Sequence, residues 1–165
     1  MLTKTLNNGR REKMKVSSKG EYALRALLVL GQQQGKVVPI QEISEKTLVT
    51  VNYLEQILLQ LKKLDYVTSK RGAKGGYLLQ KATAEVNIGE VIRDLEGPLS
   101  PMSCASVTKY EPCPLEGGCQ LKPLWSLVRD TIAFVLERTT LEDLLENRLT
   151  LFKGEEFDVI KWAQN

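Results

Sequence analysis

A strongly amphipathic helix predicted at residues 51–64 constrains the fold more than any other segment of this 165-residue chain. Its apolar residues recur three, four, seven and ten positions after the first, which places them along one side of a helix. These residues are Leu54, Ile57, Leu58, Leu61 and Leu64. Thr50 is the expected N-cap, because its hydroxyl can accept a hydrogen bond from the first turn. One side of this helix must pack inward, while the other stays open to solvent or a partner.

Two helices are predicted before this one. The first begins at Ser17 or Ser18 and ends at Gly35, since serine favours a helix start and glycine a helix end. The second covers residues 39–48, with Pro39 suited to its start. Its apolar side is expected to consist of Ile40, Ile43, Thr47 and Leu48. Only a tight turn is left between the second and third helices.

A β-hairpin is predicted directly after the third helix. Two β-prone runs, 66–70 and 76–80, flank the glycine-rich basic segment "RGAKG". Three helices with a tight turn between the last two, followed by such a hairpin, are the parts of a winged helix-turn-helix. The sequence therefore predicts a mostly α-helical fold with a small β-hairpin wing.

The rest of the chain divides into segments of different character. We expect a flexible basic extension at 1–13, a DNA-binding domain at 14–97 that ends with a short helix at 87–97, and a cysteine loop at 98–121. A helical region at 122–147 then carries a long apolar stripe, and 148–165 form a weakly patterned tail. The stripe comprises Leu124, Leu127, Val128, Ile132, Val135 and Leu136.

The front half of the chain is basic. Residues 14–76 contain ten Lys or Arg against five Asp or Glu, whereas residues 77–165 contain nine against fourteen. This asymmetry favours a polyanionic partner for the front half, although uneven surface charge alone would give the same pattern. No apolar run approaches the length of a membrane span, and the first residues lack the apolar stretch of a signal peptide, so we expect a cytoplasmic protein without a membrane partner.

Polar residues gather where a winged helix-turn-helix would touch double-stranded DNA. Asn and Gln side chains can bond adenine, Glu can accept from cytosine, and hydroxyls or helix N-terminal amides suit phosphates. Five candidates begin the third helix: Thr50, Asn52, Tyr53, Glu55 and Gln56. Three basic candidates lie at the hairpin tip: Lys70, Arg71 and Lys74. Each alone could be a solvated polar residue, but turn, helix, wing and charge together indicate DNA binding.

All three cysteines lie in one loop, at Cys104, Cys113 and Cys119. Zinc sites usually contain paired C-x2-C knuckles, which this spacing lacks, so a larger iron–sulfur cluster suits the loop better. The chain has no histidine. A fourth ligand would have to be a carboxylate, another atom type or a small molecule. Thiol oxidation, zinc binding and inert cysteines remain alternatives.

Four segments resemble the IscR/NsrR/CymR family of bacterial regulators, the Rrf-two family: "MKVSSKGEYALRALL", "VNYLEQILLQLKK", "SKRGAKGGYLL" and "IGEVIRDLEGP". The resemblance runs from Met14 to about Leu145. It implies a winged-helix homodimer, joined by its long C-terminal helix, that reads pseudo-palindromic promoter sites. It also implies Asn52, Tyr53, Glu55 and Gln56 as helix contacts and Arg71 as the wing contact. A dimer would place two recognition helices about one DNA turn apart.

Cluster-binding members of this family carry three cysteines in the same loop, which implies Cys104, Cys113 and Cys119 as ligands of a 2Fe–2S or 4Fe–4S cluster. The first interval is longer than in IscR, and Lys122 stands where IscR has its histidine ligand. NsrR uses an acid at the start of its first helix, donated by the other subunit, and that position matches Glu21 here. An acid in a first helical turn also interacts favourably with the helix dipole. Glu111 and Glu116 are weaker candidates within the loop.

The sequence thus predicts a homodimeric transcription regulator that senses redox, iron or nitric oxide status through a cluster. Rearrangement of the loop would couple to DNA affinity, and a typical coupling corresponds to about 5–150-fold. The alternative is a cluster-free regulator controlled by thiol oxidation, zinc, a metabolite or a partner protein. The resemblance to CymR implies sensing of a partner enzyme or a metabolite without a cluster, but CymR lacks the three cysteines, so their presence here weighs against that mode. The wing argues against an iron–sulfur carrier. We expect no enzyme, because no histidine could act as base for a nucleophilic cysteine.

Overall fold

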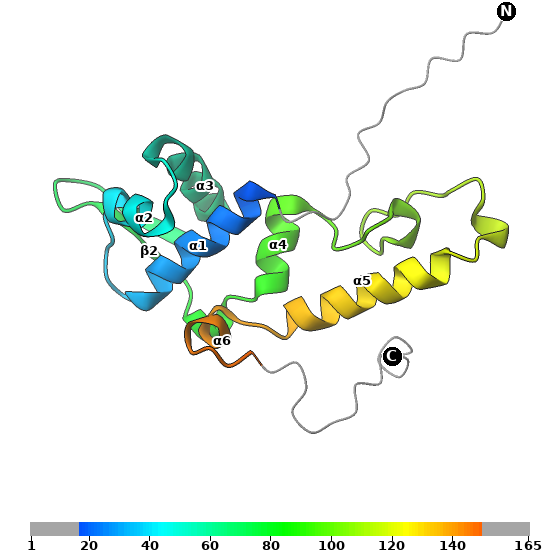
Figure 1. Cartoon of the computed structure of the whole chain (residues 1–165). Coiled ribbons are helices and arrows are strands. Elements are labelled where there is room, and N and C mark those ends of the chain that lie inside the picture. Colours follow the sequence, from blue (N-terminus) through cyan, green and yellow to red (C-terminus); the bar gives the residue numbers. More distant parts are fainter. Residues whose placement is uncertain (1–16, 150–165) are drawn as a thin grey trace, which may run out of the picture.

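The computed structural model describes residues 17–149, which form six α-helices, a two-stranded antiparallel hairpin and three short 3₁₀ turns (Figure 1). The helices are α1 (Ser18–Gln32), α2 (Ile40–Thr47), α3 (Val51–Lys63), α4 (Ile88–Glu96), α5 (Lys122–Glu137) and α6 (Leu141–Leu145). The strands are β1 (Val67–Lys70) and β2 (Gly76–Leu79), and the 3₁₀ turns are η1 (Thr83–Glu85), η2 (Ser103–Ala105) and η3 (Glu116–Gly118). The mostly helical fold with a small wing is confirmed. The expected basic extension and nearly all of the C-terminal tail lie outside the described residues.

Helix α1 begins where the sequence predicts and ends earlier. Ser17 is its N-cap, and the hydroxyl of Ser17 accepts hydrogen bonds from the backbone N–H groups of Lys19 and Gly20 at 3.2 and 3.3 Å. The helix ends at Gln32 rather than Gly35, which has a φ of +80° in the turn that follows. Four of its apolar side chains are completely or almost completely buried: Ala23, Ala26, Leu27 and Leu30. This helix therefore forms the centre of the core.

The predicted inner side of α3 is confirmed. Four of its five apolar residues are buried, and Leu64 is half-buried at the end of the helix. Thr50 is the N-cap residue, but its side chain makes no capping hydrogen bond. In α2, Ile43 and Thr47 are buried as expected.

The prediction that Leu48 belongs to the apolar side of α2 is wrong. Leu48 adopts the left-handed conformation, with a φ of 58° and a ψ of 32°, and it is 87% exposed. The helix ends at Thr47, so the periodicity that would have turned Leu48 inward does not continue to it.

The hairpin is anchored to the segment that precedes α2. Strands β1 and β2 pair antiparallel, with Val67 opposite Leu79 and Lys70 opposite Gly76. The N–H of Val38 donates to the Tyr77 carbonyl at 2.8 Å, and the N–H of Tyr77 donates to the Val38 carbonyl at 2.9 Å. A Cβ at Gly76 would lie 2.2 Å from the Val38 carbonyl oxygen, so only glycine permits this approach.

The helical region predicted at 122–147 is divided between two helices, and the whole apolar stripe lies on the first of them, α5. Helix α5 ends at Glu137, and α6 turns back onto α1, where Leu141 is fully buried. Gly31 of α1 makes room, because a Cβ there would lie 2.7 Å from Cδ1 of Leu145. Thr140 caps α6: its hydroxyl accepts from the Asp143 N–H at 3.2 Å, and the Asp143 carboxylate accepts from the Thr140 N–H at 2.9 Å.

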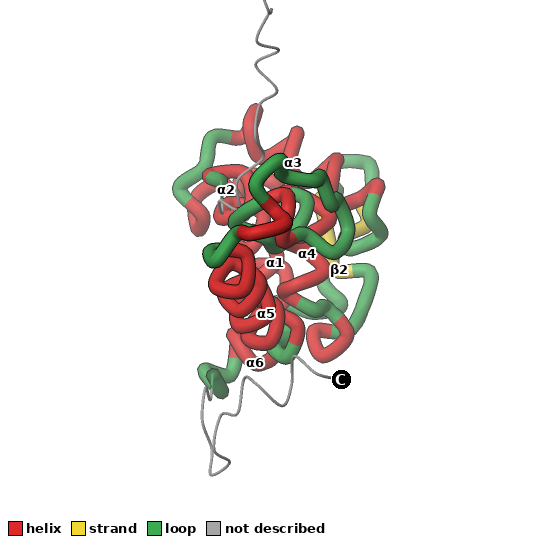
Figure 2. The backbone as a smooth tube through the Cα atoms, turned by 90° about the vertical axis from the view of Figure 1, so that its right-hand side faces the viewer, coloured by secondary structure: helices red, strands yellow, loops and turns green. Residues whose placement is uncertain are grey.

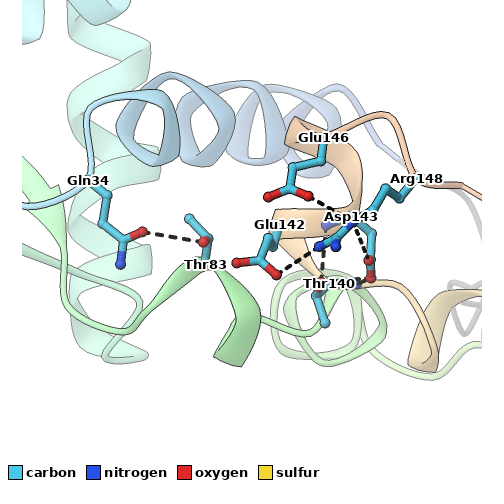
Figure 3. A network of polar contacts seen from close by, with 7 residues as sticks. All are labelled: Gln34, Thr83, Thr140, Glu142, Asp143, Glu146 and Arg148. Carbon is cyan, nitrogen blue, oxygen red and sulfur yellow. Dashed lines mark hydrogen bonds and ion pairs between the residues drawn. The ribbon is translucent and has the colours of Figure 1, made fainter.

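Two groups of polar contacts lie near α6 (Figure 3). The Thr83 hydroxyl in η1 donates to Gln34, just beyond α1, at 3.3 Å. Arg148, after α6, pairs with Glu142 and Glu146, both at 2.9 Å. Arg148 therefore holds the end of the described chain against α6 itself, while the Gln34–Thr83 bond joins η1 to the end of α1.

Helix α5 extends away from the other helices, and the cysteine loop lies over its N-terminal half (Figure 1). Viewed almost along its axis, α5 lies at one side of the body (Figure 2). It contains no fully buried residue. Arg129 ties the loop to α5 by donating to the Ala105 carbonyl at 2.5 Å. Within residues 17–149, no helix has both the length and the apolar character needed to cross a membrane.

We predict that Leu141→Ala lowers the free energy of unfolding by about 2–5 kcal/mol, because it leaves a cavity between α6 and α1. Urea unfolding measures this loss. Leu149→Ala is the control, since Leu149 is 55% exposed and its truncation should change stability by less than about 0.5 kcal/mol. Equal effects of the two substitutions would contradict the placement of α6 in the core.

Candidate functional site

The outer side of α3 presents a row of polar side chains. Thr50, Asn52, Glu55 and Gln56 are all exposed at its N-terminal half. Tyr53 differs from the other predicted contacts, because it is half-buried against Tyr22 of α1, with ring centroids 5.9 Å apart and planes at 87°. This edge-to-face contact is favourable and fixes α3 on α1. Tyr53 thus has a structural role that sequence reasoning missed.

The wing tip is a compact basic turn. Lys70, Arg71 and Lys74 are all exposed. The N–H of Gly75 donates to the Gly72 carbonyl at 2.8 Å, and Gly72 has a φ of +109°, a conformation that favours glycine. The tip projects beyond α2 at the left of Figure 1, at the opposite end of the molecule from the cysteine loop.

The turn between α2 and α3 is held by two side chains. The Ser44 hydroxyl donates to the Val49 carbonyl at 2.6 Å, and the Arg25 guanidinium of α1 donates to the Thr47 carbonyl at 3.2 Å. The second bond satisfies a carbonyl at the end of α2 that has no partner within the helix, and the first satisfies a carbonyl of the turn itself. They fix the angle at which α3 leaves the body.

Arg25 also contacts the predicted ligand Glu21. The guanidinium pairs with the Glu21 carboxylate at 2.5 Å, one turn earlier on α1, and lies 5.5 Å from the centre of the Tyr22 ring. Arg25 is a site residue that the sequence did not predict, although its i, i+4 spacing from Glu21 is the usual signal for such an ion pair. One residue thus joins the first turn of α1 to the turn before α3.

The three cysteines of the loop are free and half-buried. As a donor set, three reduced thiols on one loop suit an iron–sulfur cluster. The geometry does not assemble that site: across residues 17–149, no three Cys, Asp or Glu side chains converge closely enough to hold a metal ion. Glu111 is exposed, and Glu21 lies on α1 with its carboxylate paired to Arg25.

Glu116 organises the loop around itself. Its carboxylate accepts from the Lys122 ammonium, from the Tyr110 hydroxyl at 2.5 Å and from the Cys113 N–H at 3.4 Å. Lys122 and Tyr110 lower the pKa of the Glu116 carboxyl by hydrogen bonding to its charged form. The same bond raises the pKa of Lys122, and nearby Cys104 acts in the same direction. Lys122 therefore keeps its positive charge to a higher pH than a free lysine.

The helical arrangement, the tight turn before α3, the exposed polar row and the basic wing define a DNA-binding protein of the winged helix-turn-helix class. Comparison with protein families specifies it further. The model of the Rrf2 family, described as iron-dependent transcriptional regulator, matches residues 16–147. The chain belongs to the Rrf2 family, and it is a DNA-binding transcription regulator.

Individual relatives agree with this assignment. An rrf2-like HTH-type transcriptional regulator of Rhodobacter capsulatus is 36% identical over 137 residues, which cover 79% of this chain and 91% of the relative. CymR of Bacillus subtilis is 36% identical over 132 residues, which cover 79% of this chain and 89% of CymR. The CymR structure has a TM-score of 0.67, with 34% identity over 81% of this chain and 98% of that one. The structure of IscR from T. potens has a TM-score of 0.63, with 30% identity over 87% of this chain and 95% of that one.

We predict that Gly76→Ala detaches the wing from the body, because the added Cβ would collide with backbone atoms of Val38. Hydrogen exchange of the Val38 and Tyr77 amides reports the loss, and their protection should fall by about 10–100-fold. Gly117→Ala is the control, since a Cβ there meets nothing within 4 Å. Unchanged protection in Gly76→Ala would contradict the described anchoring.

Proposed function

We propose that this regulator reads a pseudo-palindromic DNA operator as a homodimer, with α3 in the major groove and the wing tip on the adjacent backbone or minor groove. The observation that carries this proposal is the exposed polar row of α3 beside three exposed basic residues of the wing. An α-helix fits the major groove, and an arginine fits a narrow minor groove. The inner residues of the same helix are buried, so the helix can present only this side.

Each exposed side chain suits a particular group on DNA. Asn52 and Gln56 can pair with adenine edges, and Glu55 can accept from the cytosine amine. Thr50, at the N-terminal end of α3, suits a phosphate, where the helix dipole also favours negative charge. Lys70 and Lys74 would neutralise phosphates, while Arg71 reaches the groove. Tyr53 reaches DNA only through its hydroxyl, because its ring packs on Tyr22.

The dimer proposal rests on α5. Leu124 and Leu127 are 48% and 42% exposed, and the other residues of the stripe are only half-buried in the single chain. A second copy of α5 would cover this apolar side, as a two-fold interface requires the same surface from both partners. Two copies of α3 would then face DNA together.

For sensing, we propose that Cys104, Cys113 and Cys119 hold an iron–sulfur cluster, with Glu21 of the partner subunit as a fourth ligand. The thiol chemistry of the loop and the iron-dependent description of the family support this. Since residues 17–149 of one chain do not bring three ligands together, binding would require the loop to close and the second subunit to contribute. When bound, such a cluster would supply an iron that exchanges ligands at its oxygen-coordinated corner.

The chain itself connects Glu21 to the DNA-reading helix. Glu21 pairs with Arg25, and Arg25 bonds the Thr47 carbonyl in the turn before α3. If the Glu21 carboxylate binds elsewhere, Arg25 loses a partner and its contacts with the turn and with Tyr22 must readjust. Tyr22 in turn packs on Tyr53 of α3. This chain of contacts provides a physical route from a ligand change to the angle of α3.

A second candidate is cluster-free regulation through the same loop, by thiol oxidation, zinc, a metabolite or a partner protein. One observation favours it: within residues 17–149 the three free thiols do not converge on a metal position. CymR of B. subtilis is described as a global cysteine regulator. Under this alternative the loop changes state through its thiols, and the DNA-reading surface is the same.

We predict that Arg71→Ala weakens binding to a selected operator duplex by about 5–150-fold and reduces the salt slope by about one. Fluorescence anisotropy at several salt concentrations measures both quantities. Arg138→Ala is the matched control, because Arg138 stacks on Phe134 at the end of α5, away from the wing. Wild-type affinity of Arg71→Ala at every salt concentration would contradict the wing contact.

We predict that protein purified without oxygen is coloured and contains iron and sulfide. Replacing any of the three cysteines by serine should remove the colour, the iron and the sulfide. Glu21→Ala should alter the visible spectrum and speed cluster loss. Its matched control is Glu42→Ala, because Glu42 is also a first-turn acid in an i, i+4 ion pair, with Lys46. A colourless, iron-free wild type after reconstitution would contradict the cluster and favour thiol-based sensing.

A further inference from the structure

Leu48 is an exposed leucine in an unusual backbone conformation. At 87% it is the most exposed large apolar residue between positions 17 and 149, and its φ of 58° lies in the left-handed region. Leucine is disfavoured there, because its Cβ approaches the following carbonyl oxygen. Glycine or asparagine would adopt this conformation at less cost. The side chain therefore gives the fold little, since it is neither buried nor suited to its backbone.

The position of Leu48 is fixed by its neighbours. The Thr47 carbonyl before it accepts from Arg25, and the Val49 carbonyl after it accepts from Ser44. Leu48 lies two residues before Thr50, the N-cap of α3, so their Cα atoms are at most about 7.6 Å apart. Because the backbone is already ordered, this leucine could make a contact on DNA without the entropic cost of fixing a loop.

We infer that Leu48 is a specificity-determining residue that contacts the 5-methyl group of a thymine in the operator. This inference rests on the proposed major-groove docking of α3. At the base edges of the major groove, the thymine methyl is the apolar group, and the remaining positions present donors and acceptors. A leucine at the entrance of α3 is chemically matched to that methyl and to none of the hydrogen-bonding groups. It would add selection for thymine to the polar contacts of Asn52, Glu55 and Gln56.

The experiment begins with a duplex that the full-length wild type selects from a random-sequence pool. Individual thymines are then replaced by deoxyuridine, which removes only the methyl group. Dissociation constants are measured for the wild type, Leu48→Gly, Leu48→Asn and the control Leu149→Gly, which alters an exposed leucine beyond α6. Thermal unfolding of each variant accompanies the binding measurements.

The wild type should lose about 3–10-fold in affinity at one thymine in each half-site, the amount expected for one buried methyl group. Leu48→Gly and Leu48→Asn should bind the thymine duplex about 3–10-fold more weakly and no longer distinguish deoxyuridine. Their melting temperatures should equal or exceed that of the wild type, because both residues accept the left-handed conformation. Leu149→Gly should behave like the wild type on both duplexes.

Three results would overturn the inference. The wild type could bind thymine and deoxyuridine duplexes equally, or the Leu48 variants could keep full affinity, as they would if Leu48 faced a protein. The variants could also weaken binding while preserving the thymine preference, which would assign Leu48 an indirect effect. In each case sequence-selective binding by the wild type leaves the proposed function intact. A wild type that selects no sequence from the pool would remove the proposed function and this inference together.

Discussion

Burial of α1 is the constraint on which the rest of the structure depends. Its inner side packs against α2, α3 and α6 and approaches the hairpin and α4, so one helix orients every element of the first domain. Gly20 and Gly31 allow close approach, at one end by the Glu96 side chain of α4 and at the other by Leu145 of α6. The outer side of the same helix carries Glu21 and Arg25. The centre of the core and the proposed route from Glu21 to α3 are therefore parts of one helix.

Local sequence patterns predicted the elements whose structure is determined locally. The apolar spacing of α3, the N-cap Ser17 and the glycine-rich hairpin needed only the rules of helix and turn formation. The return of α6 onto α1 could not be predicted this way, because the sequence indicates one helical region over residues 122–147, whereas the cap at Thr140 starts a new helix. The exposure of Leu48 was missed for a similar reason. Its conformation depends on where α2 ends, and distant Arg25 helps to hold that turn.

The candidate sites differ in how far the sequence could define them. The proposed DNA-contacting residues follow from the inner side of α3, because residues that cannot face the core must face outward. In the cysteine loop, the sequence identifies the three thiols but not how they are arranged. The loop lacks a periodic pattern, so tertiary contacts determine where its side chains lie. Glu116 is an example. Its hydrogen bonds to Lys122, Tyr110 and Cys113 order the loop, but the spacing of these residues in the sequence does not indicate the bonds. The proposed iron–sulfur site would depend further on a second subunit, which one sequence cannot place.

The central claim is that two α3 helices, related by two-fold symmetry, bind DNA together. Hydroxyl-radical footprinting of the wild type on its selected duplex tests this directly. The account predicts two protected segments related by a two-fold axis, with centres separated by a whole number of helical turns of about 10–10.5 base pairs each. Protection of a single unsymmetric segment, or of DNA without regard to sequence, would contradict it.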